Sequence, residues 1–351
     1  MKPIEASKEH LSNEGAALVP VVPAGTLVMS FKLSIGRTAI AAVDLRTNEA
    51  IAAFTKLRDD VNVRYLGYAL QEHDWGTGDG ANDKLMGATL NKAKLSSAMI
   101  PIPPLDEQER IVAKLDQVTA EVSSLRQVLT RELREAFHLE QIHLDRVVAH
   151  QGLFTALMDL CEVVTDGDHQ PPPKSDSGIP FITISCIDKN TRTIDLNAGF
   201  RVPKSYYEEL AETRRPRTGD VLVTVTGSFG IPVVVREDEP FCFQRHIALL
   251  RPKSGVSSDW LAYVLRSSAV QREIEGAATG AAQRTLSLRS LRNLFIPKVD
   301  LSEQLRQVEE LDTFASNSAS LRDSLVRRRA LTESLMKAAL KQALQQGRAA
   351  A

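Results

Sequence analysis

Apolar residues recur at helical spacing over two long stretches of the chain and alternate with polar residues over much of the remainder. The first stretch runs from Asp106 to about Val148, and neither proline nor glycine interrupts it. Spacings of three or four residues separate its apolar positions, which are Ile111, Leu115, Val118, Val122, Leu125, Leu129 and Leu133. This pattern predicts a long helix with one narrow apolar stripe, close to the seam of a coiled coil.

A second stretch of this kind closes the chain. It begins at Leu301, and its apolar positions include Val308, Leu311, Phe314, Leu321 and Leu325. A helix of about 42 residues is roughly 60 Å long, and so narrow a stripe cannot be buried within a domain of its own. We therefore expect long helices over 105–150 and 301–351 that pair in opposite directions as an antiparallel coiled coil.

Short apolar runs bounded by turn residues lie before and between these helices, and such runs are typical of β-strands. The strand-like runs are Thr26–Phe31, Thr38–Val43, Phe181–Ile187, Val221–Thr226, Val233–Arg236 and Phe241–Leu250. Shorter helices are expected from Tyr65 and over Trp260–Ile274. The predicted fold class is therefore α+β.

The chain repeats itself. Residues 89–116 align without a gap onto 285–312, and IPIPPLDEQERIVAKLD at Ile100–Asp116 corresponds to IPKVDLSEQLRQVEELD from Ile296. Twelve of the 28 aligned positions are identical, namely 89, 90, 95, 100, 101, 105, 107, 108, 110, 112, 115 and 116 with their counterparts 196 residues later. Self-similarity over so long a period indicates two related domains, each ending in a long helix.

The likeness extends upstream from this connector, but only for part of the way. Gly25 and Gly36 match Gly219 and Gly230, whereas 160–200 would need counterparts before Met1. We therefore expect an incomplete first unit over 1–104, a first helix over 105–150, a complete second unit over 151–300 and a second helix over 301–351. The first unit would then belong either to a chain that starts late or to a partial subunit.

Composition limits the compartment and the chemistry. Three cysteines lie far apart with no CxxC pair, which argues against a zinc site or a disulfide framework and fits the reducing cytoplasm. No apolar run approaches the length of a membrane span. The formal charge of −1 gives no general sign of nucleic-acid binding, so that function must rest on local clusters.

The common catalytic motifs are missing from the sequence. It contains no GxxxxGK[ST] phosphate loop, no HExxH and no GxSxG, and neither a glycine-rich cofactor turn nor an acidic aromatic–proline motif of a methyltransferase stands out. We expect a chain that is not an enzyme and has neither a cofactor nor a metal.

The duplicated unit with its connector and long helix resembles the specificity subunit of type I restriction–modification systems. The motif at Ile100–Asp116 and its repeat carry the resemblance, together with TDGDHQPPP at 165–173, GDVLVTVTGSFG at 219–230 and TGAAQRTLSLRSLRNLFIP at 279–297. The resemblance implies that each target recognition domain reads one half of a split double-stranded DNA site, and that the paired helices set the gap. It also implies that two methyltransferase subunits dock on the helices and connectors, and that a restriction (motor) subunit can join them.

Sequence reading needs hydrogen-bonding side chains on loops that can enter the major groove, with cations for the phosphates. In the second unit the candidates are His169, Gln170, Lys174, Arg214, Arg215, Arg217, Thr226, Ser228, Gln244, Arg245, Gln283 and Arg284. In the first unit the corresponding candidates are Lys32, Arg37, Asn82 and Lys84. We expect that the three arginines, which flank Pro216, cannot all pair with local residues, and this favours contact with phosphates.

Each candidate residue can also be explained without DNA binding. The arginines can belong to a solvated turn, Gln244 and Arg245 with His246 can form a hydrogen-bond cluster at the edge of the core, and 279–284 can be a flexible linker. Two other functions therefore stay open for the whole chain. It can be a coiled-coil scaffold that only binds methyltransferase subunits, or two copies can form a homodimer that restores the symmetry.

Overall fold

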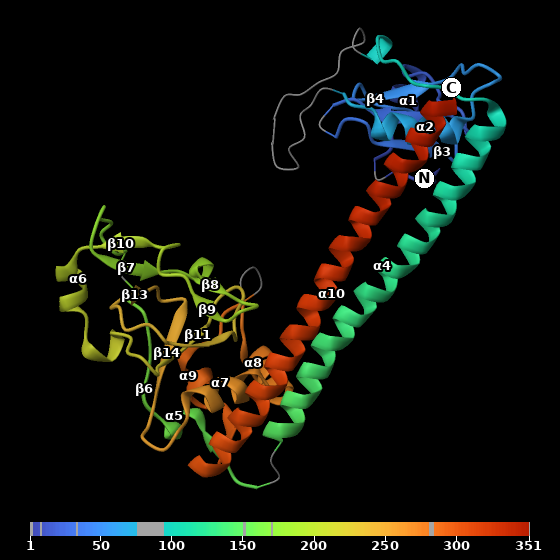
Figure 1. Ribbon diagram of the computed structural model, residues 1–351. Coiled ribbons are helices and arrows are strands. Elements are labelled where there is room, and N and C mark those ends of the chain that lie inside the picture. The colour runs from blue at the N-terminus through green and yellow to red at the C-terminus, as the bar shows by residue number, and fades with distance from the viewer. Residues whose placement is uncertain are drawn as a thin grey trace. The chain divides into compact units, whose positions relative to one another are not determined.

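The structure is a computed structural model that describes residues 3–7, 9–32, 34–75, 95–149, 152–169, 171–280 and 284–350 (Figure 1). The chain divides into two compact units. Unit 1 comprises Met1–Glu132 and Ser324–Ala351, and unit 2 comprises Leu133–Asp323. Both long helices therefore contribute to both units.

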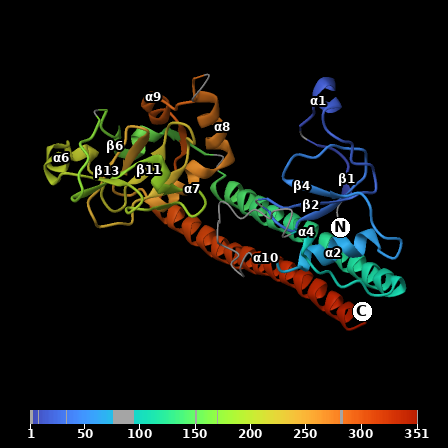
Figure 2. The same ribbon diagram turned by 90° about the horizontal axis from the view of Figure 1, so that it is seen from above.

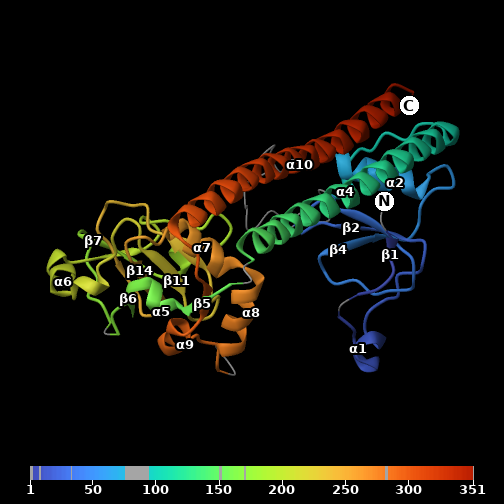
Figure 3. The same ribbon diagram turned by 90° about the horizontal axis from the view of Figure 1, so that it is seen from below.

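The two long helices are α4, Leu105–Val148, and α10, Leu301–Ala350, and Figures 2 and 3 show them side by side. In unit 1, Arg126 forms an ion pair with Glu333 at 3.6 Å, and Thr119 contacts Met336. In unit 2, Arg146 pairs with Glu310 at 3.2 Å. In unit 1 the partner in α10 changes from Met336 to Glu333 as α4 advances from Thr119 to Arg126. In unit 2 it changes from Arg322 to Glu310 as α4 advances from Glu140 to Arg146. The helices are therefore antiparallel in each unit. No helix among the described residues is long and apolar enough to cross a membrane.

The predicted seam is confirmed in part. Ile111, Leu115, Leu129, Leu311 and Leu325 are buried, and Val118, Val122, Leu133, Val308 and Phe314 are half-buried. The prediction is wrong for Leu125 and Leu321, whose exposed fractions are 45% and 52%. A helix with 3.6 residues per turn drifts against a 3.5-residue repeat, so these two leucines lie on the flank of the stripe, while Ala136 and Thr332 are buried in the pair.

Unit 2 is built on a four-stranded antiparallel sheet in the order β12-β11-β14-β6. Its strands are β6 (Cys161–Asp166), β11 (Val221–Thr224), β12 (Pro232–Val234) and β14 (Ile247–Pro252). A second sheet has the order β10-β7-β13, with β7 at Ile179–Ile182, β10 at Phe200–Val202 and β13 at Cys242–Phe243. Two short pairs complete the strands, namely β5 (Phe154–Ala156) with β15 (Phe295–Pro297), and β8 (Ile187–Asp188) with β9 (Thr193–Ile194).

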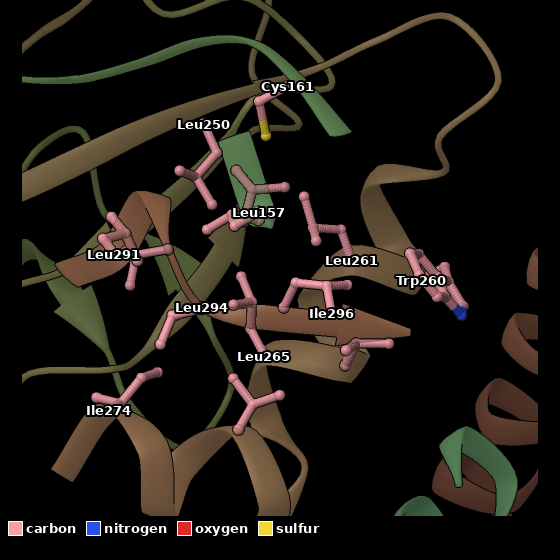
Figure 4. Packing of buried hydrophobic residues seen from close by; sticks show 14 of the residues in the cluster. Leu157, Cys161, Leu250, Trp260, Leu261, Leu265, Ile274, Leu291, Leu294 and Ile296 are labelled. Carbon is pink, nitrogen blue, oxygen red and sulfur yellow. The ribbon is translucent and has the colours of Figure 1, made fainter. Parts of the chain in front are cut away.

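Apolar side chains cover both faces of this main sheet. On one face, Leu250 packs with Leu157, Leu261 and Ile296 from the helices and from β15 (Figure 4). On the other face, a second cluster joins β11 and β14 to the second sheet and contains Leu222, Leu249, Ile182 and Phe243. The helices of unit 2 besides α4 and α10 are α5 (Leu157–Leu160), α6 (Lys204–Glu209), α7 (Ser258–Arg266), α8 (Ser268–Ala277) and α9 (Leu288–Arg292).

The described residues of unit 1 form a four-stranded sheet in the order β1-β3-β2-β4. The strands are β1 (Pro3–Ile4), β2 (Leu27–Ser30), β3 (Thr38–Ala41) and β4 (Ile51–Phe54), and the short helices are α1 (Asn13–Ala17) and α2 (Val63–Glu72). A buried cluster of Leu27, Met29, Leu66 and Leu70 joins the sheet to α2.

The repeat seen in the sequence is a repeat of structure down to the strand register. Leu27 pairs with Phe54 across β2 and β4, and its counterpart Val221 pairs with Leu250 across β11 and β14. Gly36 and Gly230 have φ of +80° and +79° at the same turn, a backbone region that glycine enters without strain. The duplication inferred from the connector therefore includes the sheet.

Three segments differ from the sequence prediction. The expected strand Phe181–Ile187 ends at Ile182 in β7, and Ile184–Cys186 form a 3-10 helix before β8. The expected strand Phe241–Leu250 is divided into β13 and β14 by a turn at 244–246. The expected helix Trp260–Ile274 is divided into α7 and α8 at Ser267, whose hydroxyl caps α8 by accepting a hydrogen bond from the Val270 N–H. Serine at such a position stabilises a new helix start, and apolar periodicity does not register it.

Candidate nucleic-acid interface

Three loops leave the same end of the main sheet in unit 2. β6 ends at Asp166 beside Ala248, and β11 ends at Thr224 opposite Ile247, the first residue of β14. The loop after β6, the loop after β11 and the turn before β14 are therefore neighbours. We call residues 166–169, 225–229, 244–246 and 284–285 the loop end of unit 2.

Backbone contacts fix the turn at 244–246. The Gln244 N–H donates to the Ile182 carbonyl at 3.0 Å, and the Val225 N–H donates to the His246 carbonyl at 2.9 Å. Gly167 packs so closely that a Cβ there would lie 2.1 Å from the carbonyl oxygen of Phe243. A rigid turn thus carries Arg245, which is exposed and has no ion pair or side-chain hydrogen bond to any other described residue.

Carboxylates orient the cations behind this turn. Asp166 lies 2.9 Å from the His169 ring nitrogen and 3.7 Å from the Arg214 guanidinium, and Asp168 also lies 3.7 Å from Arg214. The Tyr206 hydroxyl donates to Asp168 at 3.1 Å, and burial together with that carboxylate raises the pKa of Tyr206. The cluster therefore holds its side chains in place with little excess positive charge.

The three arginines around Pro216 all have local partners, which contradicts the argument made from their crowding. Arg214 pairs with the two aspartates, Arg217 lies 3.6 Å from Glu212, and Arg215 donates to the carbonyl of Glu208. The Arg215 guanidinium also stacks 5.3 Å from the centre of the Tyr207 ring. The turn directs the three side chains apart, so neighbours reach each one separately.

Of these three, Arg214 contacts the loop end, through Asp166 and Asp168. The Arg217 N–H donates to Asp220, immediately before β11 begins, which places Arg217 at the opposite end of that strand. Lys174 is also elsewhere, over the ring of Phe200 in β10 at 5.2 Å. The predicted cations are thus divided between at least two places on unit 2.

The loop after β11 is joined to residues 284–285. The Gly227 N–H donates to the Arg284 carbonyl at 3.1 Å, and Thr226 forms an isolated β-bridge with Thr285. The Arg284 guanidinium lies 5.2 Å from the centre of the Phe229 ring. Backbone contacts therefore bring Thr226, Ser228 and Arg284 close to the turn that carries Gln244 and Arg245.

Some predicted residues cannot be placed. Gln170, Gln283, Asn82 and Lys84 lie outside the described residues. In unit 1, Lys32 pairs with Glu49 at 3.7 Å, and Arg37 is exposed at the turn before β3.

Sequence reasoning missed a set of exposed apolar residues that recurs in the two copies. Four pairs separated by 196 residues are exposed in both copies: Met99 and Phe295 at 85% and 65%, Leu105 and Leu301 at 43% and 42%, Leu125 and Leu321 at 45% and 52%, and Leu139 and Leu335 at 57% and 64%. Burial within the chain cannot explain why these positions are apolar. A comparison of the two helices in the alignment would have shown the paired leucines, but not their exposure.

The described residues contain no group of three or more His, Cys, Asp or Glu side chains that could hold a metal ion. The three cysteines are buried and free. Burial raises the pKa of both the Cys161 and the Cys242 thiols to about 12. These thiols are therefore protonated at neutral pH and serve as small apolar groups in the core.

Comparison with known proteins places these features in a family. A family profile described as "Type I restriction modification DNA specificity domain" matches residues 12–134 and 154–325. The chain is 26% identical over 326 residues to the type I restriction enzyme EcoBI specificity subunit of Escherichia coli, an alignment that covers 82% of this chain and 67% of that protein. It is 27% identical over 249 residues to a putative type I restriction enzyme specificity subunit of Haemophilus influenzae, covering 68% of this chain and 61% of that protein.

Solved structures show the same fold. The HsdS subunit from Thermoanaerobacter tengcongensis aligns with a TM-score of 0.53 and 22% identity, over 94% of this chain and 82% of that chain. A chain from a study of complex assembly and conformational transition of the type I R-M system aligns with a TM-score of 0.72 and 21% identity, over 92% and 82%. Both alignments extend over most of this chain, so the fold described above is shared with these two structures.

Proposed function

Because the chain belongs to the family of type I restriction–modification DNA specificity domains, we propose that it is the subunit that reads the DNA sequence in such a system. Unit 2 reads one half of a split site through its loop end. The observation that carries this proposal is the convergence of three polar loops at one end of the main sheet, with Arg245 held at the tip of a fixed turn.

The side chains at the loop end suit the major groove. An arginine can donate two hydrogen bonds to guanine, and a glutamine can pair with the donor and acceptor of adenine. Arg245 and Gln244 stand next to each other on the fixed turn, and His169 and Arg214 are oriented by Asp166 behind it. Because Asp166 already positions His169 and Arg214, and the fixed turn positions the backbone of Arg245, less entropy is lost on binding, which favours sequence reading over general attraction to phosphate.

The exposed leucines of the long helices suggest where the partners dock. Unit 1 presents Leu125 and Leu335, and unit 2 presents their counterparts Leu321 and Leu139. The same partner can recognise both pairs, so we propose that one methyltransferase subunit docks on each unit and that a restriction subunit joins this complex. The family relationship supports this assignment, and catalysis then belongs to the partners.

The continuous helices suggest how the spacing between the two half-sites is set. α4 and α10 run from one unit into the other without a break. We propose that their length sets the number of base pairs between the two half-sites. A helix rises about 1.5 Å per residue and B-DNA rises about 3.4 Å per base pair, so about two residues correspond to one base pair.

The test is a footprint of the chain assembled with its methyltransferase on DNA selected from a random library. A protected, sequence-specific half-site that responds to substitutions at the loop end supports the proposal. If the complex assembles but protects no sequence, the chain is a scaffold that only docks methyltransferase subunits. If light scattering shows two copies of the isolated chain, the homodimer is the form that reads the site.

A further inference from the structure

Two arginines share one carboxylate where α7 meets the long helices of unit 2. Glu140 in α4 forms ion pairs with Arg322 in α10 and with Arg266 in α7, the latter at 3.8 Å. The Arg266 guanidinium also lies 4.9 Å from the centre of the Tyr263 ring, and the Tyr263 hydroxyl donates to Asp312 at 2.6 Å. Each of these charged side chains is therefore held by a neighbour from another helix.

A third arginine, Arg192, comes from the turn between β8 and β9. Asp188 fixes this turn, because its carboxylate accepts hydrogen bonds from the N–H groups of Asn190 and Thr191 and its carbonyl accepts from the N–H of Arg192. Arg192 has a φ of +55°, in the left-handed region. β12 contacts both β9 and α7, which brings this turn and Arg266 to the same part of unit 2.

Positive charge is in excess among these groups. Three guanidiniums stand against two carboxylates, those of Glu140 and Asp312. Arg192 and Arg266 each have a buried Nε atom without a hydrogen-bond partner, and Arg192 has neither an ion pair nor a side-chain hydrogen bond with any other described residue. Burial and the nearby charge of Arg266 lower the pKa of Arg192 to about 10. A partly buried guanidinium of this kind is destabilising unless an anion pairs with it.

Unit 1 shows that the repeated fold does not require this cluster. The tyrosine–aspartate hydrogen bond recurs there, between Tyr68 and Asp116 at 2.9 Å. Three residues after this tyrosine, α2 has Gln71 where α7 has Arg266. The repeat of 196 residues places Met336 at the position of the shared carboxylate. The arginines are therefore an addition to unit 2, which points to a role in binding.

We propose that Arg192 and Arg266 form a binding site for a phosphate group, which we call the phosphate site. The charge of Glu140 is balanced by Arg322, which leaves the other two guanidiniums for the anion. Phosphate oxygens suit this arrangement, because each guanidinium presents a planar fork of donors that matches them in geometry and charge. None of these residues belongs to the loop end. The phosphate is either a free ion or part of a DNA backbone, and the test separates these two sources.

Arg192→Gly is the variant that isolates the phosphate site. Glycine enters the left-handed region without strain, so the variant removes the side chain and keeps the turn. Arg217→Gln is the matched control, because Arg217 is exposed and pairs with Glu212 elsewhere in unit 2. Inorganic phosphate is titrated calorimetrically into the full-length chain at constant ionic strength. We expect one phosphate per chain, bound at least about tenfold more weakly by Arg192→Gly, which loses charge-assisted hydrogen bonds, and bound unchanged by the control.

Thermal unfolding of the same proteins gives a second readout. Phosphate should raise the unfolding midpoint of the unchanged chain, because it binds the folded state, and should leave the midpoint of Arg192→Gly where it is. In chloride alone, Arg192→Gly should unfold at the same or a higher temperature than the unchanged chain, since it removes a cation that faces Arg266. If the glycine variant does not fold, Arg266→Gln removes the other guanidinium, and we expect the same loss of phosphate binding.

Duplex DNA, with the methyltransferase present, identifies the source of the phosphate. If inorganic phosphate binds as described and Arg192→Gly leaves the affinity for DNA unchanged, the ligand is a free phosphate. If inorganic phosphate does not bind but Arg192→Gly weakens DNA binding and flattens its salt dependence, the ligand is the DNA backbone. The proposal is wrong if Arg192→Gly changes neither affinity, or if Arg217→Gln has the same effect. The phosphate titration involves no DNA sequence, so its failure leaves base reading by the loop end untouched.

Discussion

Gln108 and Gln304 make the same contacts in the two units, and both are almost fully buried. The Gln108 side-chain oxygen accepts a hydrogen bond from the N–H of Asn62, the N-cap of α2, at 2.8 Å. The Gln304 oxygen accepts from the N–H of Ser257, the N-cap of α7, also at 2.8 Å. Each glutamine therefore fastens a long helix to the start of the short helix beside it, which explains why the connector keeps this residue in both copies.

Replacing Gln304 with Ala should destabilise the chain by about 1–3 kcal/mol, because it leaves a partly buried backbone N–H without an acceptor. Urea unfolding measures the change. Arg306→Ala is the matched control, since Arg306 is exposed and pairs only with its helix neighbours Glu303 and Glu310. We expect that control to be nearly neutral, and equal losses in the two variants would contradict the role given to Gln304.

A comparison of Arg245, at the loop end, with Arg217, at the other end of β11, tests whether DNA binding depends on the loop end. Arg245→Ala should weaken specific DNA binding by about 1–3 kcal/mol if it reads a base. Arg217→Ala, at the other end of β11, should change affinity much less. The measurement is a binding titration of both variants at several salt concentrations. A flatter salt dependence for Arg245→Ala with unchanged sequence preference would show that Arg245 contacts phosphate instead.

The buried cysteines make the folded chain less stable at alkaline pH. The thiol pKa is 9.0 without the fold and is raised to about 12 for both Cys161 and Cys242. Above pH 9 the unfolded chain therefore releases thiol protons that the folded chain retains. The stabilisation that the buried thiols give the folded state is complete below pH 9 and is lost as the pH rises from 9 towards 12. We expect the free energy of unfolding to fall over that range. Native Cys161 and Cys242 should resist alkylation at pH 8 and react once urea unfolds the chain.

At the scale of elements, the long helices carry two different apolar surfaces. One is the buried stripe that joins α4 to α10, with Leu129 and Leu325 exposed by only 2%. The other is the exposed flank with Leu125 and Leu335 in unit 1, and Leu139 and Leu321 in unit 2. The first surface holds each unit together, and the second is free for partners.

Leu125→Gln combined with Leu335→Gln should impair docking of methyltransferase to unit 1 and leave unit 2 able to bind. Removing two exposed leucines from an interface removes apolar contact area without opening a cavity in the fold. Val326→Gln is the matched control, because Val326 is 55% exposed but has a threonine, Thr130, at the counterpart position. The measurement is the mass of the complex at saturating methyltransferase. Two bound copies with the double variant would contradict the assignment.

The sequence predicted the elements well where one pattern determined them. The helix stripe placed α4 and α10 within a few residues, and the strands of the repeated sheet followed from apolar runs between glycine turns. It failed where tertiary contacts decide. Leu125 has the spacing of a seam residue, but the position of the partner helix leaves it exposed.

The candidate site shows the same limit. Arg245 and Gln244 were identified as polar residues inside an apolar run, which is a local signal. The pairing of Arg214 with Asp166 and Asp168 joins residues almost 50 positions apart, and no spacing rule in one sequence predicts it. The crowding of arginines around Pro216 therefore gave the wrong inference about their partners.

At the scale of the whole molecule, the chain contains two copies of one sheet with the same register. Unit 2 has a sheet covered on both faces and loops fixed at one end, and unit 1 has the same sheet register with one edge that no described residue pairs. The copies share the connector and the exposed leucines, and the loop end is described for unit 2. The described residues therefore carry the proposal of DNA reading in unit 2 and the proposal of docking in both units.

The central claim is that unit 2 recognises the sequence of one half of the DNA site. The direct test exchanges residues 154–297 for the same segment of another member of the family and selects bound DNA from a random library, with the methyltransferase present. The account predicts that the selected sequence changes in the half contacted by unit 2 and stays the same elsewhere. An unchanged sequence after the exchange, with the complex intact, would contradict it.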